Sequence, residues 1–353
     1  TGANNVAIGA ASLDANTTAS NNVAVGVNTL GVNTTGASNT AIGHEALDAN
    51  TTANNNTAVG YRSLLANTTG AANVALGSIA SFKNTTASNN TAIGYGALYD
   101  NTTGANNVAV GYLTLENNTT ASNNTAVGTD SLKANTTGTE NTAVGMRCAD
   151  ANTTGSYNSA FGMSTLGVNT TGQRNTAIGR TALEANTTGS YNTAVGMDAL
   201  NTTTTGEYNI AIGYLAISSS ATVSGECTLG TSQIDNLRCN DQSISALSDS
   251  RDKTDVIDSP YGLGFINTVR PVQFKWETRD GNIKDGKTRL GFIAQELLAA
   301  TDGNNAVLDL VMDNNEDRLE AKYGNLLPIA IQAIQELSAQ VDALTARITT
   351  LEG

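Results

Sequence analysis

The sequence predicts an all-β parallel solenoid shaft, a short β neck, and a small α+β unit that ends in a coiled coil. A motif of Asn-x-Ala-x-Gly recurs every 17 residues, from Asn5 to Gly213, without one slip. Such a fixed period is the signature of stacked coils. All three prolines of the chain lie beyond the repeat, and the last segment steps its apolar residues by three and four, as coiled coils do. We therefore divide the chain into 1–213, 214–247 and 248–353.

The composition excludes several classes of function. The 353 residues carry a net charge of −13 and no basic stripe, so we expect no nucleic-acid partner. No stretch approaches the roughly 18 apolar residues of a membrane span. The one histidine, His44, leaves too little for His-based triads or metal sites, so we expect neither a metal nor a cofactor. Cys148, Cys227 and Cys239, an odd number at no metal-like spacing, argue against a disulfide framework.

The repeat reads as a short strand followed by turns. With the motif Asn as offset zero, offset two is always Ala, offset four is always Gly, and offset three is Ile, Val, Leu or Phe. Strand side chains alternate between faces, so we expect offset three to form one row of the core. The opposite Ala and Gly face admits a close neighbour, either another layer of the same coil or another chain. Offset eight, usually Leu, is expected to form a second core row.

Two further features of the repeat bear on function. Asn-Thr-Thr at offsets eleven to thirteen predicts a turn ladder held by side-chain hydrogen bonds. We favour that interpretation over an ice-binding Thr ladder or a set of glycosylation sites. Exposed aromatic residues at offset five and just before the motif Asn suit carbohydrate or protein contact, and equally oligomer packing. The candidate receptor contacts are Tyr61, Tyr95, Tyr112, Tyr157, Tyr191 and Tyr208.

The Asn-x-Ala-x-Gly frame resembles the head repeats of trimeric autotransporter adhesins. Those repeats form left-handed parallel β-rolls that pack three to a bundle, and they are shorter than 17 residues. Over residues 5 to about 217 the resemblance implies a parallel β-roll in a trimer.

The sequence after Gly213 predicts a change of architecture. Short β-prone pieces separated by Gly and Ser form the expected neck, and the residues after them have the pattern of an ordinary α+β domain. A strand is expected over 272–276 and an amphipathic helix over about 291–300. The closing helix, from about residue 327, predicts a coiled coil whose β-branched residues favour two strands. We nevertheless expect a trimer, because the rest of the chain would set the stoichiometry. The seam residues are Ile334, Leu337, Val341, Leu344, Ile348 and Leu351.

The C-terminal third resembles a known family of self-cleaving chaperones. It carries Ser-Asp-x-Arg-x-Lys at 248–253, Arg-Leu-Gly-Phe-Ile-Ala-Gln-Glu at 289–296, Tyr323-x-x-Leu326 and a closing coiled coil. Together these look like the endosialidase-type intramolecular chaperone domain of phage tail spikes and fibres, also classed as a serine peptidase family. The resemblance implies a trimeric chaperone that assembles the fibre before it and then releases itself by cutting the chain in cis.

The same resemblance implies the residues of a single-turnover autoprotease. It makes Ser248 the nucleophile, Lys253 the base, and the bond between Leu247 and Ser248 the cleavage site. A nearby cation such as Arg251 would lower the pKa of Lys253 toward neutrality, and Asp249 would cap the turn or hold Arg251. From these residues alone, a helix N-cap at Ser248 or Asp249 is the favoured explanation, and the downstream motifs reverse that preference.

We therefore expect a homotrimeric phage tail fibre or spike that attaches to a host surface receptor, with a glycan as one candidate. Its place would be the virion, with the chaperone released in the host cytoplasm after cleavage. The chain opens on Thr1 inside a repeat, so we expect a preceding region that joins other virion proteins. The alternative is a non-cleaving trimeric adhesin or structural fibre. A polysaccharide-degrading spike is less favoured, because the carboxylates of the repeats are scattered.

Overall fold

The computed structural model describes residues 2–231, 234, 250–277, 286–313 and 319–352. The chain divides into two compact units, Thr1–Thr231 and Ser232–Gly353. Each unit is described by itself below. The first is called the shaft.

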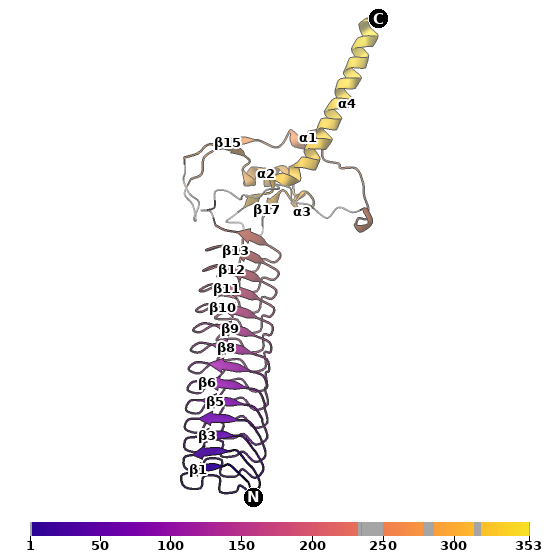
Figure 1. Cartoon of the computed structure of the whole chain (residues 1–353). Helices are drawn as coiled ribbons and strands as arrows, with labels where there is room; N and C mark the ends of the chain where they lie inside the picture. Colours follow the sequence, from indigo (N-terminus) through magenta and orange to yellow (C-terminus); the bar gives the residue numbers. More distant parts are fainter. Residues whose placement is uncertain (1, 232–233, 235–249, 278–285, 314–318, 353) are drawn as a thin grey trace. The chain divides into compact units, whose positions relative to one another are not determined.

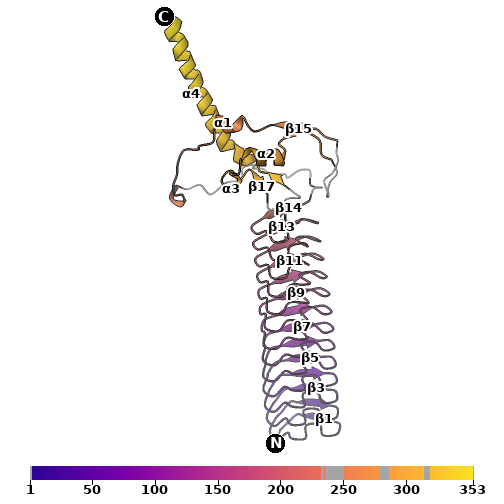
Figure 2. The same ribbon diagram turned by 180° about the vertical axis from the view of Figure 1, so that it is seen from behind.

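The shaft is a parallel β-solenoid, as predicted. Its single sheet has 14 strands whose spatial order is their sequence order, so each coil stacks on the one before it (Figures 1 and 2). Each strand residue pairs with the residue 17 positions later in the chain, as Ala24 pairs with Ala41. The strands are β1 Val6–Ile8, β2 Val23–Val25, β3 Thr40–Ile42, β4 Thr57–Val59, β5 Val74–Leu76, β6 Thr91–Ile93, β7 Val108–Val110, β8 Thr125–Val127, β9 Thr142–Val144, β10 Ser159–Phe161, β11 Thr176–Ile178, β12 Thr193–Val195, β13 Ile210–Ile212 and β14 Cys227–Leu229.

The interior of the shaft contains Ala and Leu, not the β-branched residues of the strands. Ala24 and Leu30 are fully buried, and the same offsets are buried in the other internal coils, which confirms offset eight as a core row. The prediction for offset three is wrong: Ile8 is 60% exposed and Ile178 is 43% exposed. The Ala face turns toward the interior of its own coil, which is the first of the two alternatives given for it above.

Close backbone approach explains why small residues face inward. The motif glycines have φ between 126° and 144°, a region that side chains rarely adopt. A Cβ on Gly26 would lie 2.5 Å from the carbonyl oxygen of Gly43. Successive coils are therefore too close on this side for a larger side chain.

Buried asparagines join each coil to the next. The Oδ1 atom of Asn22 accepts a hydrogen bond from the backbone N–H of Asn39 at 2.9 Å, and its Nδ2 donates to Gly36 O at 2.9 Å. A second column, at offset eleven, links side chain to side chain: Asn50 Nδ2 donates to Asn33 Oδ1 at 2.9 Å. Both columns are buried, so their hydrogen bonds replace those that water would make.

The threonines form the predicted turn ladder. Thr34 Oγ1 donates to Thr51 O at 3.1 Å, and the equivalent bond recurs from coil to coil. The first Thr of each Asn-Thr-Thr therefore uses its hydroxyl within the solenoid, while the second, such as Thr35, is exposed. This confirms the interpretation as a ladder of hydrogen-bonded turns.

The sheet continues beyond the periodic sequence. β14 pairs in parallel with β13, with Cys227 opposite Ile210. The residues around β14 do not form an Asn-x-Ala-x-Gly motif. The segment assigned to a neck thus begins with one more rung of the sheet. Its last predicted strand, 244–247, lies outside the described residues.

The second unit is a small α+β fold with two antiparallel strand pairs. β15 Val272–Phe274 pairs with β16 Arg289–Gly291, and β17 Val311–Met312 pairs with β18 Glu320–Ala321. The predicted strand at 272–276 is confirmed in its first part. The predicted helix begins later than expected, because Gly291 ends β16. The helical elements are η1 Ser250–Asp252, α1 Leu263–Ile266, α2 Ala294–Ala300, α3 Asn305–Leu308, η2 Tyr323–Asn325 and α4 Leu326–Glu352.

Among the described helices, none is long and apolar enough to cross a membrane.

The asparagine column gives a test of what holds the shaft together. Asn118 Nδ2 donates to Asn101 Oδ1 at 2.9 Å and to Ala121 O at 3.0 Å, and its Oδ1 accepts from Asn135 Nδ2 at 3.0 Å. Asn118→Ala leaves buried partners without hydrogen bonds, so we expect a loss of about 1 to 3 kcal/mol in the free energy of unfolding. Thermal and denaturant unfolding measure it. Asn117→Ala, at the half-buried neighbouring position, is the control, and equal losses in the two variants would contradict the role of the column.

Candidate functional site

The predicted cleavage site lies at the start of the second unit. The η1 turn spans Ser250–Asp252, and the backbone N–H of Lys253 donates to Ser250 O at 3.4 Å. Arg251 and Lys253 are both exposed in the single chain. In the sequence, these two basic residues follow the predicted scissile bond. The other residues of this site lie outside the described residues: Leu247, Ser248 and Asp249.

The motif at 289–296 connects β16 to α2 and meets η2 through one aromatic contact. The rings of Phe292 and Tyr323 meet edge to face with centroids 5.3 Å apart, and the Tyr323 hydroxyl oxygen lies 3.4 Å from the backbone N of Phe292. A Cβ on Gly291 would lie 2.7 Å from that hydroxyl. The glycine of the motif therefore leaves room for the tyrosine of the later Tyr-x-x-Leu step.

The acidic end of the same motif is held by an ion pair. Arg270 Nε donates to Glu296 Oε2 at 2.9 Å, and Arg270 Nη2 bonds the other carboxylate oxygen. The hydrogen bond to Arg270 lowers the pKa of Glu296 below its ordinary value. Both side chains are exposed, so the pair fixes the orientation of α2 more than it stabilises the fold.

The long helix α4 is attached to the rest of the unit by a carboxylate. Glu336 Oε2 accepts from the backbone N–H of Leu263 at 2.8 Å, at the N-terminus of α1. Gln332 Nε2 donates to the other oxygen at 3.2 Å. A Cβ on Gly262 would lie 2.1 Å from Glu336 Oε1, so the glycine admits the carboxylate. The negative charge of Glu336 at the N-terminus of α1 also interacts favourably with the helix dipole.

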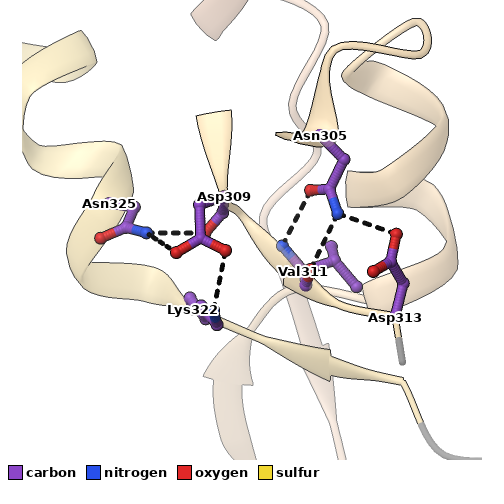
Figure 3. Close-up of polar contacts among 6 residues, drawn as sticks. All are labelled: Asn305, Asp309, Val311, Asp313, Lys322 and Asn325. Carbon is purple, nitrogen blue, oxygen red and sulfur yellow. Dashed lines mark hydrogen bonds and ion pairs between the residues drawn. The ribbon is translucent and has the colours of Figure 1, made fainter. Parts of the chain in front are cut away.

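An asparagine side chain fixes the turn between α3 and β17 (Figure 3). Asn305 Nδ2 donates to Val311 O at 2.8 Å, and Asn305 Oδ1 accepts from Val311 N at 3.1 Å. Its Nδ2 also lies 3.0 Å from Asp313 Oδ2. The amide thus pairs with the backbone at the start of β17 as a neighbouring strand would.

A second group beside it joins α3 to η2 (Figure 3). Asp309 has φ 45° and ends α3 in the left-handed conformation. Its carboxylate accepts from Lys322 Nζ at 2.7 Å, and its backbone carbonyl accepts from Asn325 Nδ2 at 2.6 Å. These contacts are structural, and they position the start of α4.

The seam predicted on the closing helix is exposed in the single chain. α4 is a continuous helix of 27 residues. Its buried residues lie in the first part, where Ile329 and Ala333 pack toward the small core of the unit. The six seam residues are between 49% and 85% exposed: Ile334, Leu337, Val341, Leu344, Ile348 and Leu351. A row of large apolar residues on an isolated helix is the surface that a coiled-coil partner covers.

One comparison with known proteins matches part of this unit. Residues 248–308 match the family described as chaperone of endosialidase. The match begins at the predicted nucleophile, includes the 289–296 motif and ends at α3, which confirms the predicted resemblance over these residues. The second unit is called the chaperone unit below, after this match. No curated protein and no solved structure matches the chain.

The six candidate receptor tyrosines are exposed, and several of them contact one another. They are between 40% and 59% exposed, and several stack between coils. Tyr95 and Tyr112 have centroids 5.5 Å apart, and Tyr191 and Tyr208 have centroids 4.8 Å apart. Their ring faces are thus largely covered by each other, so a sugar ring could stack only at the end of a column.

The sequence analysis missed one member of this surface. Arg174 lies between the rings of Tyr157 and Tyr191, with its Cζ 5.1 Å and 5.4 Å from the two centroids. Its Nη1 donates to the Tyr191 hydroxyl at 2.9 Å. The signal was present, because Arg174 occupies the repeat position of the neighbouring tyrosines.

The described residues contain no group of His, Cys, Asp and Glu that could hold a metal ion.

The amide of Asn305 gives a test of the chaperone unit. Asn305→Asp loses both donors and places a carboxylate beside Val311 O and Asp313, so we expect a loss of about 1 to 3 kcal/mol in its free energy of unfolding. Circular dichroism of α4 during denaturation measures it. The control is Asn304→Asp, because Asn304 is the N-cap of α3, where Asp is also favoured. A smaller loss for Asn305→Asp than for Asn304→Asp would contradict the assigned role.

Proposed function

We propose that the chain belongs to a homotrimeric phage tail fibre or spike, and that its chaperone unit assembles the shaft before cleaving itself away. The observation that carries the proposal is the family match at 248–308, directly after a parallel solenoid. The match and the solenoid fit a phage fibre. A solenoid presents a surface or spans a distance.

The proposed cleavage uses Ser248 and Lys253. Lys253 would take the proton from the Ser248 hydroxyl as the oxygen attacks the carbonyl carbon of Leu247. The protonated Lys253 would then give that proton to the Ser248 nitrogen as the peptide bond breaks, which leaves Leu247 as an ester on the Ser248 oxygen. Water would hydrolyse this ester, giving the Leu247 carboxylate and restoring the Ser248 hydroxyl. Folding supplies the orientation, because both groups belong to one chain. Lys253 is exposed in the single chain, so we infer that contact with another copy covers it before cleavage.

Intact mass after denaturation tests the cleavage. We expect the parent chain to give two fragments that join at Leu247 and Ser248, and Ser248→Ala to give one full-length chain. Lys253→Met should cut at least a hundredfold more slowly, because the general base is lost. Ser250→Ala, two residues away, is the control that should still be cut. Full-length chain from all four proteins would leave the alternative of a non-cleaving trimeric fibre or adhesin.

We propose that α4 is one contact that makes the trimer. Leu337→Asp with Leu344→Asp places two carboxylates in the seam, and a buried charge without a partner is strongly unfavourable. We therefore expect light scattering to show loss of trimer. The matched control is Gln340→Asp with Ala343→Asp, at exposed positions off the seam. Trimers of unchanged stability in the first variant would rule out the coiled coil as an assembly contact.

The proposed role in the virion is attachment to a host-surface receptor. Tyr61, Tyr95 and Tyr112 remain proposed contacts, since they are exposed on a rigid scaffold. Because their faces are stacked, ring edges and hydroxyls would make the contacts. Cytoplasmic release of the chaperone unit follows only if the cut takes place during assembly in the host.

A further inference from the structure

One side of the shaft is uncharged and largely apolar, and no other described residue of the shaft covers it. It is the outer face of the sheet, formed by offsets one and three of every coil. These offsets hold only Val, Ile, Leu, Phe, Thr and Ser from coil to coil, with no charged residue. Ile8, Leu76 and Ile212 are between 46% and 60% exposed. Charged residues lie in other columns, such as Glu116 and Asp150 at offset nine.

The size of the outer face fits a protein interface. Fourteen rungs at about 4.8 Å give a length of about 60 Å, and three strand residues give a width of about 10 Å. The product, about 600 Å² per copy, approaches the roughly 800 Å² per partner of a stable interface. Soluble monomers rarely expose a contiguous apolar patch larger than a few hundred Å².

One edge of the face changes near the C-terminal end of the shaft. The column just before the motif Asn is Asn, Ser, Ala or Glu in the first nine coils, and then becomes Tyr157, Arg174, Tyr191 and Tyr208. These four residues form a ladder of stacked groups on successive coils. No such change occurs at the other end of the strands, where offset five carries large residues in early and late coils alike, such as Tyr61 and Met163.

The backbone does not favour this change. All four ladder residues have φ between 56° and 62°, a conformation in which Asn is enriched and bulky residues are rare. The buried leucines at offset eight, such as Leu30, have a similar φ, but their burial compensates. Exposed Glu140 holds the same conformation in the same column, with φ 58°, so the conformation belongs to the coil. What sets the ladder apart is that its large exposed side chains stack on one another over four successive coils.

We propose that the outer face is where copies of this chain meet along the shaft, and that the ladder Tyr157–Arg174–Tyr191–Tyr208 contacts the neighbouring copy. The inference rests on the proposed self-association and names its surface. Copies of the same chain fit better than another partner, because the face is uncharged and has the same rungs from end to end. The exposed seam of α4 is a second unpartnered apolar surface that also fits a copy. A glycan fits poorly, because the ring faces of the ladder are already covered.

Cysteine cross-linking in the full chain tests the proposal. Ile178→Cys places a thiol on the outer face, and Thr171→Cys places one on the exposed threonine side of the preceding turn. Exposed Cys227 is replaced by Ser together with Cys239. Cys148 stays, because burial raises the pKa of its thiol to about 12 and keeps it unreactive. We expect a short bismaleimide to join copies through position 178 and not through position 171.

The outcomes separate this inference from the proposed function. A multimer by light scattering that cross-links at 171, at both positions or at neither would overturn the outer face as the interface, while self-association stands. A monomer at all concentrations would overturn both.

The ladder is tested in the same Ile178→Cys chain. Tyr191→Asn restores the residue that favours this backbone conformation, so it should not harm the coil, but it removes the contact proposed for the neighbouring copy. We expect the initial rate of cross-linking at 178 to fall at least threefold. Tyr99→Asn removes a tyrosine that stacks on Phe82 at 5.1 Å in a different column, and should leave the rate unchanged. Equal rates in the two variants would overturn the role of the ladder.

Discussion

The shaft depends on polar groups that can be satisfied only by the next coil. A buried Asn in one rung accepts from the backbone of the following rung and donates into the adjoining turn. An isolated coil would leave these groups buried without partners, which is more unfavourable than exposing them to water. The period cannot drift, because one residue more or less would move every amide out of its column. The strict repeat of 17 residues follows from this constraint.

The period was enough to predict a parallel solenoid, and the Leu column was enough to predict one core row. The orientation of the strand could not be read in the same way, because an alternating Ala and Val pattern does not say which face is inside. Large apolar residues usually face inward, but here the leucines and asparagines already fill the interior. The relevant signal was parity: Asn22, Ala24 and Gly26 lie at even offsets and share a face. The amide and the glycine both require a close backbone, and Ala follows them inside.

The chaperone unit shows the same limit in another form. The motif at 289–296 predicted its family, yet the helix begins at Ala294, later than expected, because Gly291 still belongs to β16. The hydroxyl of Tyr323, far along the chain, occupies the space beside that glycine. Tertiary contacts of this kind leave no local pattern. The cleavage residues were inferred from the motif alone, and Leu247, Ser248 and Asp249 lie outside the described residues.

A perfectly periodic outer face creates a difficulty for assembly that the rest of the chain can resolve. If two shafts slide by one rung, offsets one and three meet equivalent residues again, so the apolar contact loses only about one rung in fourteen. A periodic face can therefore supply binding energy, but it does not fix the register in which two copies pair. The chaperone unit is not periodic, and the ladder from Tyr157 to Tyr208 occupies only the last coils of the repeat. In the proposed assembly, the chaperone unit would hold the C-terminal ends together at high effective concentration. The ladder would then give the aligned state an energy different from that of each slipped state. The copies could therefore stay in register after the chaperone unit is removed.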